Sequence, residues 1–149
     1  MKKILYLISI CFVVLTYFSC NNDDDNDIVT TDKIIGKWQF SQEFFNNEEI
    51  ELTVCDKKMT LQFFENGTYI EEDFEMNDTQ TACISAGTIT ETWENLGGSK
   101  YKITMMSTPG MSITLNVTVT FETNKMTVVY SEAIDGEEIL VKAVFIKVT

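Results

Sequence analysis

The chain has 149 residues and a formal charge of −12, with 23 acidic residues, 11 lysines, no arginine and no histidine. An acidic surface repels phosphate groups, so we expect no binding to nucleic acid. Without histidine there is no Ser-His or Cys-His nucleophile pair and no imidazole zinc site, and we therefore predict a protein that is not an enzyme and holds no metal or cofactor. A carboxylate pair or a lysine base is the remaining route to catalysis.

Residues 1–19 have the features of a cleaved secretory leader. Two lysines precede an apolar run, 4–18, which is shorter than the roughly 20 residues that a membrane-spanning helix needs. The run ends at Ser19-Cys20, and residues 17–20 resemble a bacterial lipobox, which implies that Cys20 becomes the lipidated first residue of the mature protein. The alternative is plain secretion with a free Cys20. Either way about 130 residues remain, enough for one domain with its own core.

Residues 20–33 are predicted to be a disordered acidic tether, because 21–27 contains only Asn and Asp and has nothing apolar to bury. Acidic residues directly behind a lipidated cysteine resemble the export tag of Bacteroidota-type surface lipoproteins. This resemblance implies that the N-terminal lipid anchors the protein in the outer membrane, facing the cell exterior. Three of the aspartates have the first spacings of a calcium loop, but Ile28 stands where that loop requires glycine, so no metal site is expected.

Two of the four cysteines remain for the folded domain. Cys11 lies in the predicted leader and Cys20 carries the lipid, so Cys55 and Cys83 are left as a pair in an oxidising compartment. We predict that these two form a disulfide. Two reduced thiols or half of a metal site are the alternatives, although no further Cys or His is present to complete a shell of soft ligands.

From residue 34 to residue 149 the sequence predicts a single all-β domain. Apolar and polar residues alternate with a period of two, most regularly over 111–121, and turn-forming pairs such as Asn66-Gly67 separate the runs. The predicted strands are 38–44, 48–54, 59–63, 68–74, 88–93, 100–106, 111–121, 126–131 and 138–148. Short connections favour an antiparallel up-and-down meander, and closing it into an eight-stranded β-barrel removes its exposed edges.

The start of this domain resembles a known family. Gly36-Lys37-Trp38 is similar to the Gly-x-Trp signature of lipocalins. With the two cysteines and the Phe-x-x-Asn-Gly-Thr segment at 63–68, it resembles the lipocalin-like domain of Bacteroidota-type surface lipoproteins. The resemblance implies a lipocalin-like barrel in which Gly36 and Trp38 are structural and Trp38 closes one end. Lipocalins pack an arginine over this tryptophan, and Lys142 or Lys147 is expected in its place.

An eight-stranded barrel is either filled by its own side chains or holds one small ligand. The alternation places Phe44 and other aromatic residues inside. The candidate ligand-binding residues are Phe40, Phe63, Glu91, Trp93, Tyr101 and Met105. An inward Glu91 needs a partner, a ligand or a raised pKa, whereas a bulge would turn it outward.

Two functional hypotheses follow from this sequence. The first is a non-catalytic surface lipoprotein whose barrel binds or sequesters a small apolar ligand. The second is a structural or protein-interaction module of a cell-surface complex, with a filled barrel. A continuous apolar cavity inside the barrel favours the first hypothesis, and a filled interior favours the second.

Overall fold

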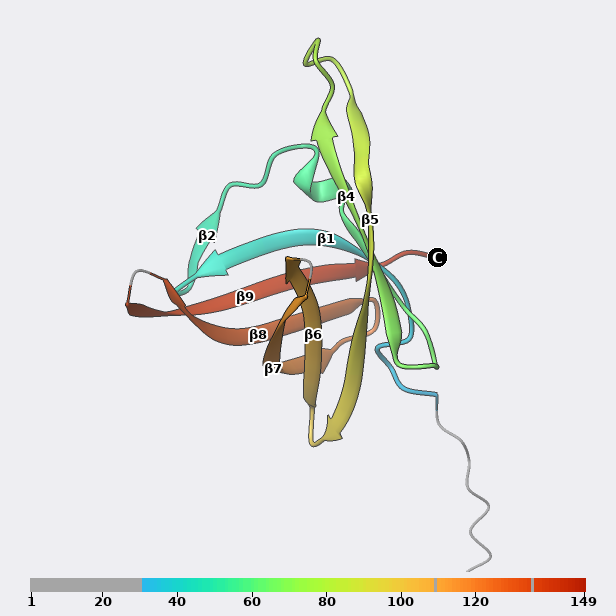
Figure 1. The fold of residues 1–149 in the computed structure, drawn as a ribbon, viewed down its shortest axis with the longest axis vertical. Coiled ribbons are helices and arrows are strands. Elements are labelled where there is room, and N and C mark those ends of the chain that lie inside the picture. The colour runs from blue at the N-terminus through green and yellow to red at the C-terminus, as the bar shows by residue number, and fades with distance from the viewer. Residues whose placement is uncertain (1–30, 109, 135) are drawn as a thin grey trace, which may run out of the picture. The chain divides into compact units, whose positions relative to one another are not determined.

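The computed structural model describes residues 31–108, 110–134 and 136–149, and the predicted leader and Cys20 lie outside these ranges. Within them the chain forms nine strands and one short 3-10 turn (Figure 1). These elements are β1 (Gly36–Phe45), β2 (Glu48–Ile50), η2 (Asp56–Lys58), β3 (Thr60–Phe63), β4 (Thr68–Met76), β5 (Cys83–Gly97), β6 (Lys100–Thr108), β7 (Met111–Phe121), β8 (Lys125–Ile134) and β9 (Glu137–Lys147). No helix in the described ranges is long and apolar enough to span a bilayer.

The strands form one closed antiparallel sheet. From β3 onward each strand pairs with the next one in the chain, and β9 pairs with β1, so that β1 and β3 to β9 make an eight-stranded barrel. The other edge of β1 has two neighbours, because its first half pairs with β3 and its second half with β2. The predicted up-and-down barrel is therefore confirmed, with β2 as an additional strand.

The segment before β1 closes one end of the barrel. Ile34 is 1% exposed, and its carbonyl accepts a hydrogen bond from the indole N–H of Trp38 at 2.7 Å. Asp32 accepts hydrogen bonds from the backbone N–H of Ile34, at 3.0 Å, and from the hydroxyl of Tyr101, at 2.8 Å. The predicted tether extends to residue 33, and the structure differs here, because Asp32 has fixed partners within the barrel.

Trp38 is 2% exposed and belongs to the core at this closed end, as the alternation predicts. Lys147 is the lysine that packs over it, with its ammonium 5.1 Å from the centre of the Trp38 ring. Gly36 has a φ of +127°, which residues with a side chain rarely adopt, and a Cβ there would meet Cε of Lys147 at 3.3 Å. The Gly-x-Trp segment and Lys147 thus form one packed unit.

A β-bulge at Ser41 changes which residues of β1 face the interior. Ser41 is skipped in the ladder between β1 and β9, so the residues after it shift by one position relative to Phe40. The prediction that Phe44 faces inward is therefore wrong. Phe44 lies opposite Lys142 on the outer face, and the Lys142 ammonium is 3.6 Å from the centre of its ring. Glu43 takes the inward position instead.

Cys55 and Cys83 form the predicted disulfide, with a Cα–Cα distance of 5.4 Å. The bond joins the connection between β2 and β3 to the first residue of β5. The two cysteines are 28 positions apart. For a loop of that length the chain-entropy model gives about 3–4 kcal/mol of stabilisation. The predicted strand 88–93 is shorter than the observed strand β5, which begins at Cys83 itself.

The ladder between β5 and β6 is incomplete. Among the described residues it runs only from Thr92 to Gly97 of β5, although β5 begins at Cys83 and β6 continues to Thr108. From Thr92 toward Cys83 the β4–β5 hairpin diverges from the β6–β7 hairpin (Figure 1), and we call this stretch of the barrel wall without β5–β6 backbone pairs the slot. We call the end of the barrel that carries this slot, opposite the end closed by Trp38, the mouth.

Candidate functional site

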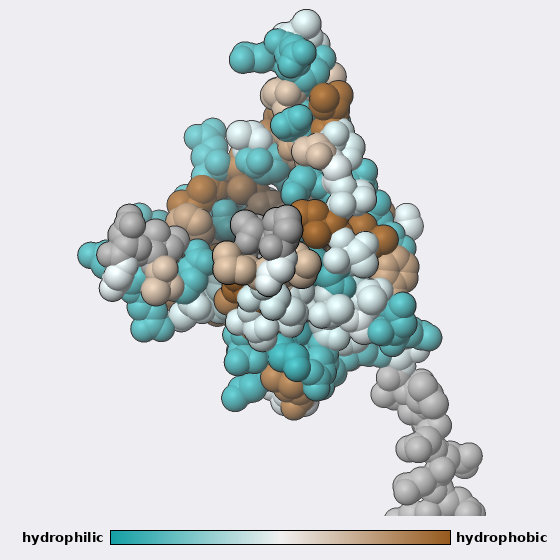
Figure 2. Space-filling model, viewed as in Figure 1, coloured by the Kyte–Doolittle hydropathy of each residue, from teal (hydrophilic) through white to brown (hydrophobic). Residues whose placement is uncertain are grey.

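An apolar cavity of about 180 Å³ lies inside the barrel. Aliphatic and aromatic side chains from seven strands form its wall, and Ile34 at the closed end also borders it. A protein cavity of about 150 Å³ holds benzene, so this one has room for a single ring with a short substituent. Figure 2 shows, on the face with the slot, a recess with apolar walls and a more hydrophilic surround.

The structure divides the six candidate ligand-binding residues into two groups. Phe40, Phe63 and Met105 line the cavity. Glu91, Trp93 and Tyr101 do not line it, and each has another position and other partners. The prediction that these three contact a ligand in the barrel is corrected accordingly.

Trp93 and Tyr101 belong to the closed end. The indole N–H of Trp93 donates to the carbonyls of Phe64 and Thr68, at 3.1 Å each, and its ring packs edge-on against Phe63. Tyr101 is buried and donates its hydroxyl hydrogen to Asp32. Burial and this acceptor raise the pKa of Tyr101. Both aromatic residues therefore pack at the closed end and do not line the cavity.

Glu91 faces inward, and its carboxylate is hydrogen-bonded to two other residues of the chain. It is 6% exposed, and its carboxylate accepts a hydrogen bond from the Tyr69 hydroxyl and another from the backbone N–H of Met106, at 3.2 Å. Met106 lies just beyond the last β5–β6 pair, so the Glu91 side chain replaces a missing backbone bond at the start of the slot. Burial, followed by the Glu91 hydrogen bond, raises the pKa of Tyr69.

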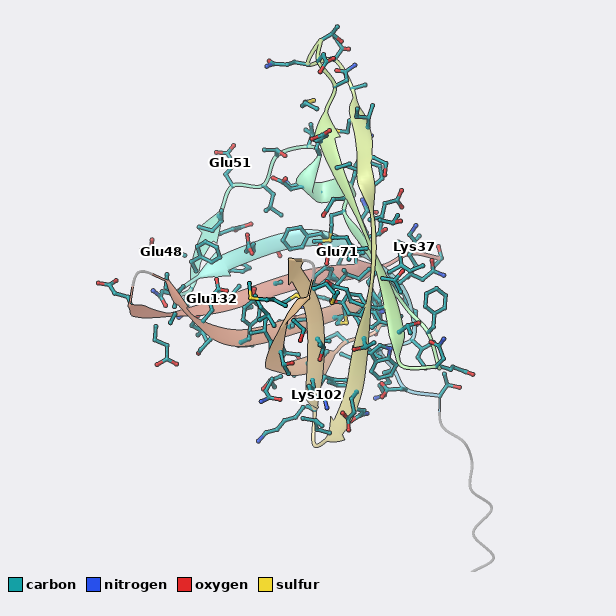
Figure 3. The ribbon with its side chains drawn as sticks, in the orientation of Figure 1. Lys37, Glu48, Glu51, Glu71, Lys102 and Glu132 are labelled. Carbon is teal, nitrogen blue, oxygen red and sulfur yellow. A yellow bond between two sulfur atoms is a disulfide. The ribbon has the colours of Figure 1, made fainter. Side chains whose placement is uncertain are left out.

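Two carboxylates that the sequence-based candidate set omits face the cavity. Glu71 of β4 and Glu43 of β1 both line it. Burial, followed by the charges of Asp73 and Glu91, raises the pKa of Glu71 to about 7. Burial is also the main cause that raises the pKa of Glu43, and the charge of Glu132 adds to it. In Figure 3, Glu71 lies toward the barrel interior, whereas Lys37 lies on the outer surface.

The inward orientation of one of these two carboxylates could have been predicted from the sequence. Glu71 has the same parity as Tyr69 on β4, so the alternation places it inside. Glu43 has no such signal, because the bulge at Ser41 reverses the parity of the second half of β1. Tyr130 also lines the cavity, and burial raises its pKa to about 12.

A second, more open hollow of about 320 Å³ lies next to the cavity. Phe40, Glu43 and Met59 line both spaces, so these three side chains stand between them. The connection from β2 to η2 and the far part of β4 form the rest of the hollow. It carries the carboxylates of Asp56 and Asp73 and gives the mouth an acidic surface. We call this hollow the vestibule.

The arrangement combines an apolar cavity with a few polar groups in its wall. The cavity excludes water from an apolar ligand, while Glu43, Glu71 and Tyr130 offer polar groups that can orient it. Within the described parts of the chain, no group of three His, Cys, Asp or Glu side chains is placed to hold a metal ion. Comparison with protein-family models, curated proteins and solved structures finds no match to the chain.

Proposed function

We propose that this protein is a non-catalytic binding protein whose barrel holds a small apolar ligand. The observation that carries the proposal is the cavity of about 180 Å³ inside a barrel that is otherwise packed to its closed end. Small-molecule sites are usually concave and apolar with a few polar groups, and eight-stranded barrels often hold one small ligand. The vestibule shares Phe40, Glu43 and Met59 with the cavity, so we propose that the ligand enters past these three side chains.

We further propose that the protein acts at the cell surface. A lipid on Cys20 holds it in the outer membrane, and the acidic residues behind Cys20 space the barrel from the bilayer. The lipobox-like residues, the acidic run and the disulfide of an oxidising compartment support this location together. The resemblance of the domain to lipocalin-like surface lipoproteins agrees with both the location and the ligand class.

The binding proposal is tested by titrating the purified protein with toluene and recording amide chemical shifts by NMR. We expect saturable shifts at residues around the cavity, such as Phe40 and Phe145. Ala143→Leu adds a larger side chain to the cavity wall and should abolish the shifts, and Ala143→Val should weaken them. Circular dichroism of both variants checks that the barrel still folds. A parent protein that shows no saturable shift refutes the proposal.

A second candidate function is a protein-interaction module, and one observation favours it. Among the described residues, the segment 83–90 of β5 pairs with β4 and with no other strand, and it contains no charged residue. Such an unpaired strand edge can accept an extended segment of another protein. Cross-linking on intact cells, with a photoreactive group introduced at Thr88, would identify a partner bound there. Ligand titration and cross-linking thus test the two functions separately.

A further inference from the structure

We infer that the cavity selects a small apolar amine, that is, a single-ring or similarly sized apolar body that carries one ammonium group. The inference deepens the proposed function and rests on it, because it names the chemical class of the ligand that the barrel would hold. It follows from the charges that face the cavity, from the aromatic rings around them and from the acidic vestibule.

Every ionisable side chain that lines the cavity is an acid. The two carboxylates come from different strands, Glu43 from β1 and Glu71 from β4, and the other ionisable groups are the phenols of Tyr69 and Tyr130. Among the residues that the structure describes, no lysine contributes to the cavity wall. A carboxylate ligand would therefore find two carboxyl groups and two uncharged phenols in the wall and no cation to pair with, which disfavours fatty acids and other anions.

In the described part of the chain, neither carboxylate at the cavity forms an ion pair with a lysine. In the described residues the three ion pairs are Lys37–Glu72, Lys102–Glu94 and Lys125–Glu122, and none of them includes Glu43 or Glu71. An ionised carboxylate in an apolar surrounding is costly unless a cation or several donors pair with it. The raised pKa of Glu71 reflects that cost. A bound ammonium would supply the charge that the chain itself does not place there.

The rest of the wall suits an ammonium attached to an apolar body. The rings of Phe40, Phe63 and Phe145 line the same cavity, and an aromatic face attracts a cation through its quadrupole. The aliphatic side chains between the rings contact the apolar part of the ligand. A purely aliphatic wall would have no such preference for a positive charge over a neutral group.

The route into the cavity has the same charge preference. The vestibule carries Glu43, Glu51, Asp56 and Asp73, which lie on three separate segments of the chain. A cleft lined by charges of one sign concentrates ligands of the opposite sign and increases their association rate. A cation is therefore favoured both on approach and once bound.

The test compares three single-ring probes of similar size and different charge. Benzylamine, benzyl alcohol and benzoate are titrated into the purified full-length protein at pH 8, which lies above the Glu71 pKa of about 7. Isothermal titration calorimetry gives the affinities, and amide chemical shifts locate the bound probe. We expect benzylamine to bind at least tenfold more tightly than benzyl alcohol, and benzoate to show no saturable binding.

Two matched variants show whether the cavity carboxylates cause the selectivity. Glu71→Gln keeps the shape of the side chain and should weaken benzylamine at least fivefold while leaving benzyl alcohol within twofold. Glu72→Gln removes the same charge from the outer face of the same strand, where Glu72 pairs with Lys37, and should change neither affinity. Ala143→Leu should remove benzylamine binding, because it reduces the cavity itself.

The outcomes separate this inference from the function on which it rests. If benzyl alcohol binds as tightly as benzylamine, or if Glu71→Gln leaves the preference unchanged, the amine inference is overturned and the apolar binding function stands. If benzylamine still binds to Ala143→Leu, it binds outside the cavity and the inference is again overturned. If none of the three probes binds, both the inference and the proposed function are refuted.

Discussion

Replacing Trp38 with Phe tests the closed end of the barrel by removing one hydrogen bond and part of one ring. In the parent the indole N–H donates to the Ile34 carbonyl at 2.7 Å, and both residues are at most 2% exposed. After the substitution that carbonyl has no donor and no access to water, which costs about 1–3 kcal/mol. Trp38→Ala also empties the space that the ring fills, so we expect about 3–5 kcal/mol for it.

Urea unfolding followed by far-ultraviolet circular dichroism measures both losses. The Lys147→Met variant completes the experiment, because it keeps most of the apolar stem and removes the ammonium that lies 5.1 Å from the Trp38 ring. Lys147→Met should lower the free energy of unfolding by about 0.5–1 kcal/mol in the parent and by close to zero when Trp38 is already Ala. A Trp38→Phe protein that unfolds within about 0.5 kcal/mol of the parent would contradict the described packing of this end, since such a change is typical of a surface position.

Three further predictions concern pH, the disulfide and the anchor. The pKa of Glu71 in the folded state, about 7, lies above its ordinary value of 4.5, so the folded state binds the proton more tightly than the unfolded state does. The protonated Glu71 therefore adds to the free energy of unfolding; this stabilisation is fully present below pH 4.5 and is lost as pH rises through about 7. Urea midpoints should fall between pH 5 and pH 8 less steeply in Glu71→Gln than in the parent, and equal slopes would disprove the assignment. Thiol titration of the denatured, unreduced mature protein should find no free thiol, because Cys55 and Cys83 are bonded, and two thiols would contradict the bond. Cys20→Ala should move the protein from the membrane fraction to the soluble fraction, and a variant that stays with the membranes would rule out lipidation.

The barrel was predictable because each strand carries its own signal. Alternating residues, as in β7, mark the face that packs, and glycine-containing turns such as Asn66-Gly67 mark where the chain reverses. Short connections then leave few topologies to consider. The disulfide was predictable for a different reason, because only Cys55 and Cys83 were left after the predicted leader and lipid site were assigned.

The functional detail was less predictable, because it depends on irregularities that strict alternation does not contain. One extra residue at Ser41 moves Glu43 inward and Phe44 outward. The height of a residue along the barrel depends on how far neighbouring strands are staggered, which is a long-range property. For this reason Trp93 lies at the closed end, and Glu91 lies where the β5–β6 ladder stops. Alternation within one strand therefore predicts the inward face only where no bulge interrupts the strand, and it does not predict how deep a residue lies in the barrel.

The ladder between β1 and β9 also determines at what stage of folding the cavity forms. It pairs Trp38 with Lys147, 109 positions apart, whereas the other barrel ladders join strands that are close in sequence. Closing a flexible loop of that length costs about 4 kcal/mol of chain entropy, so we expect the hairpins to form first and this seam to form last. Until then both outer strands have free edges, and Phe40 and Phe145, which meet across the seam, are separated. Until its last strand is in place, the chain is therefore most prone to aggregation and its cavity is not yet formed.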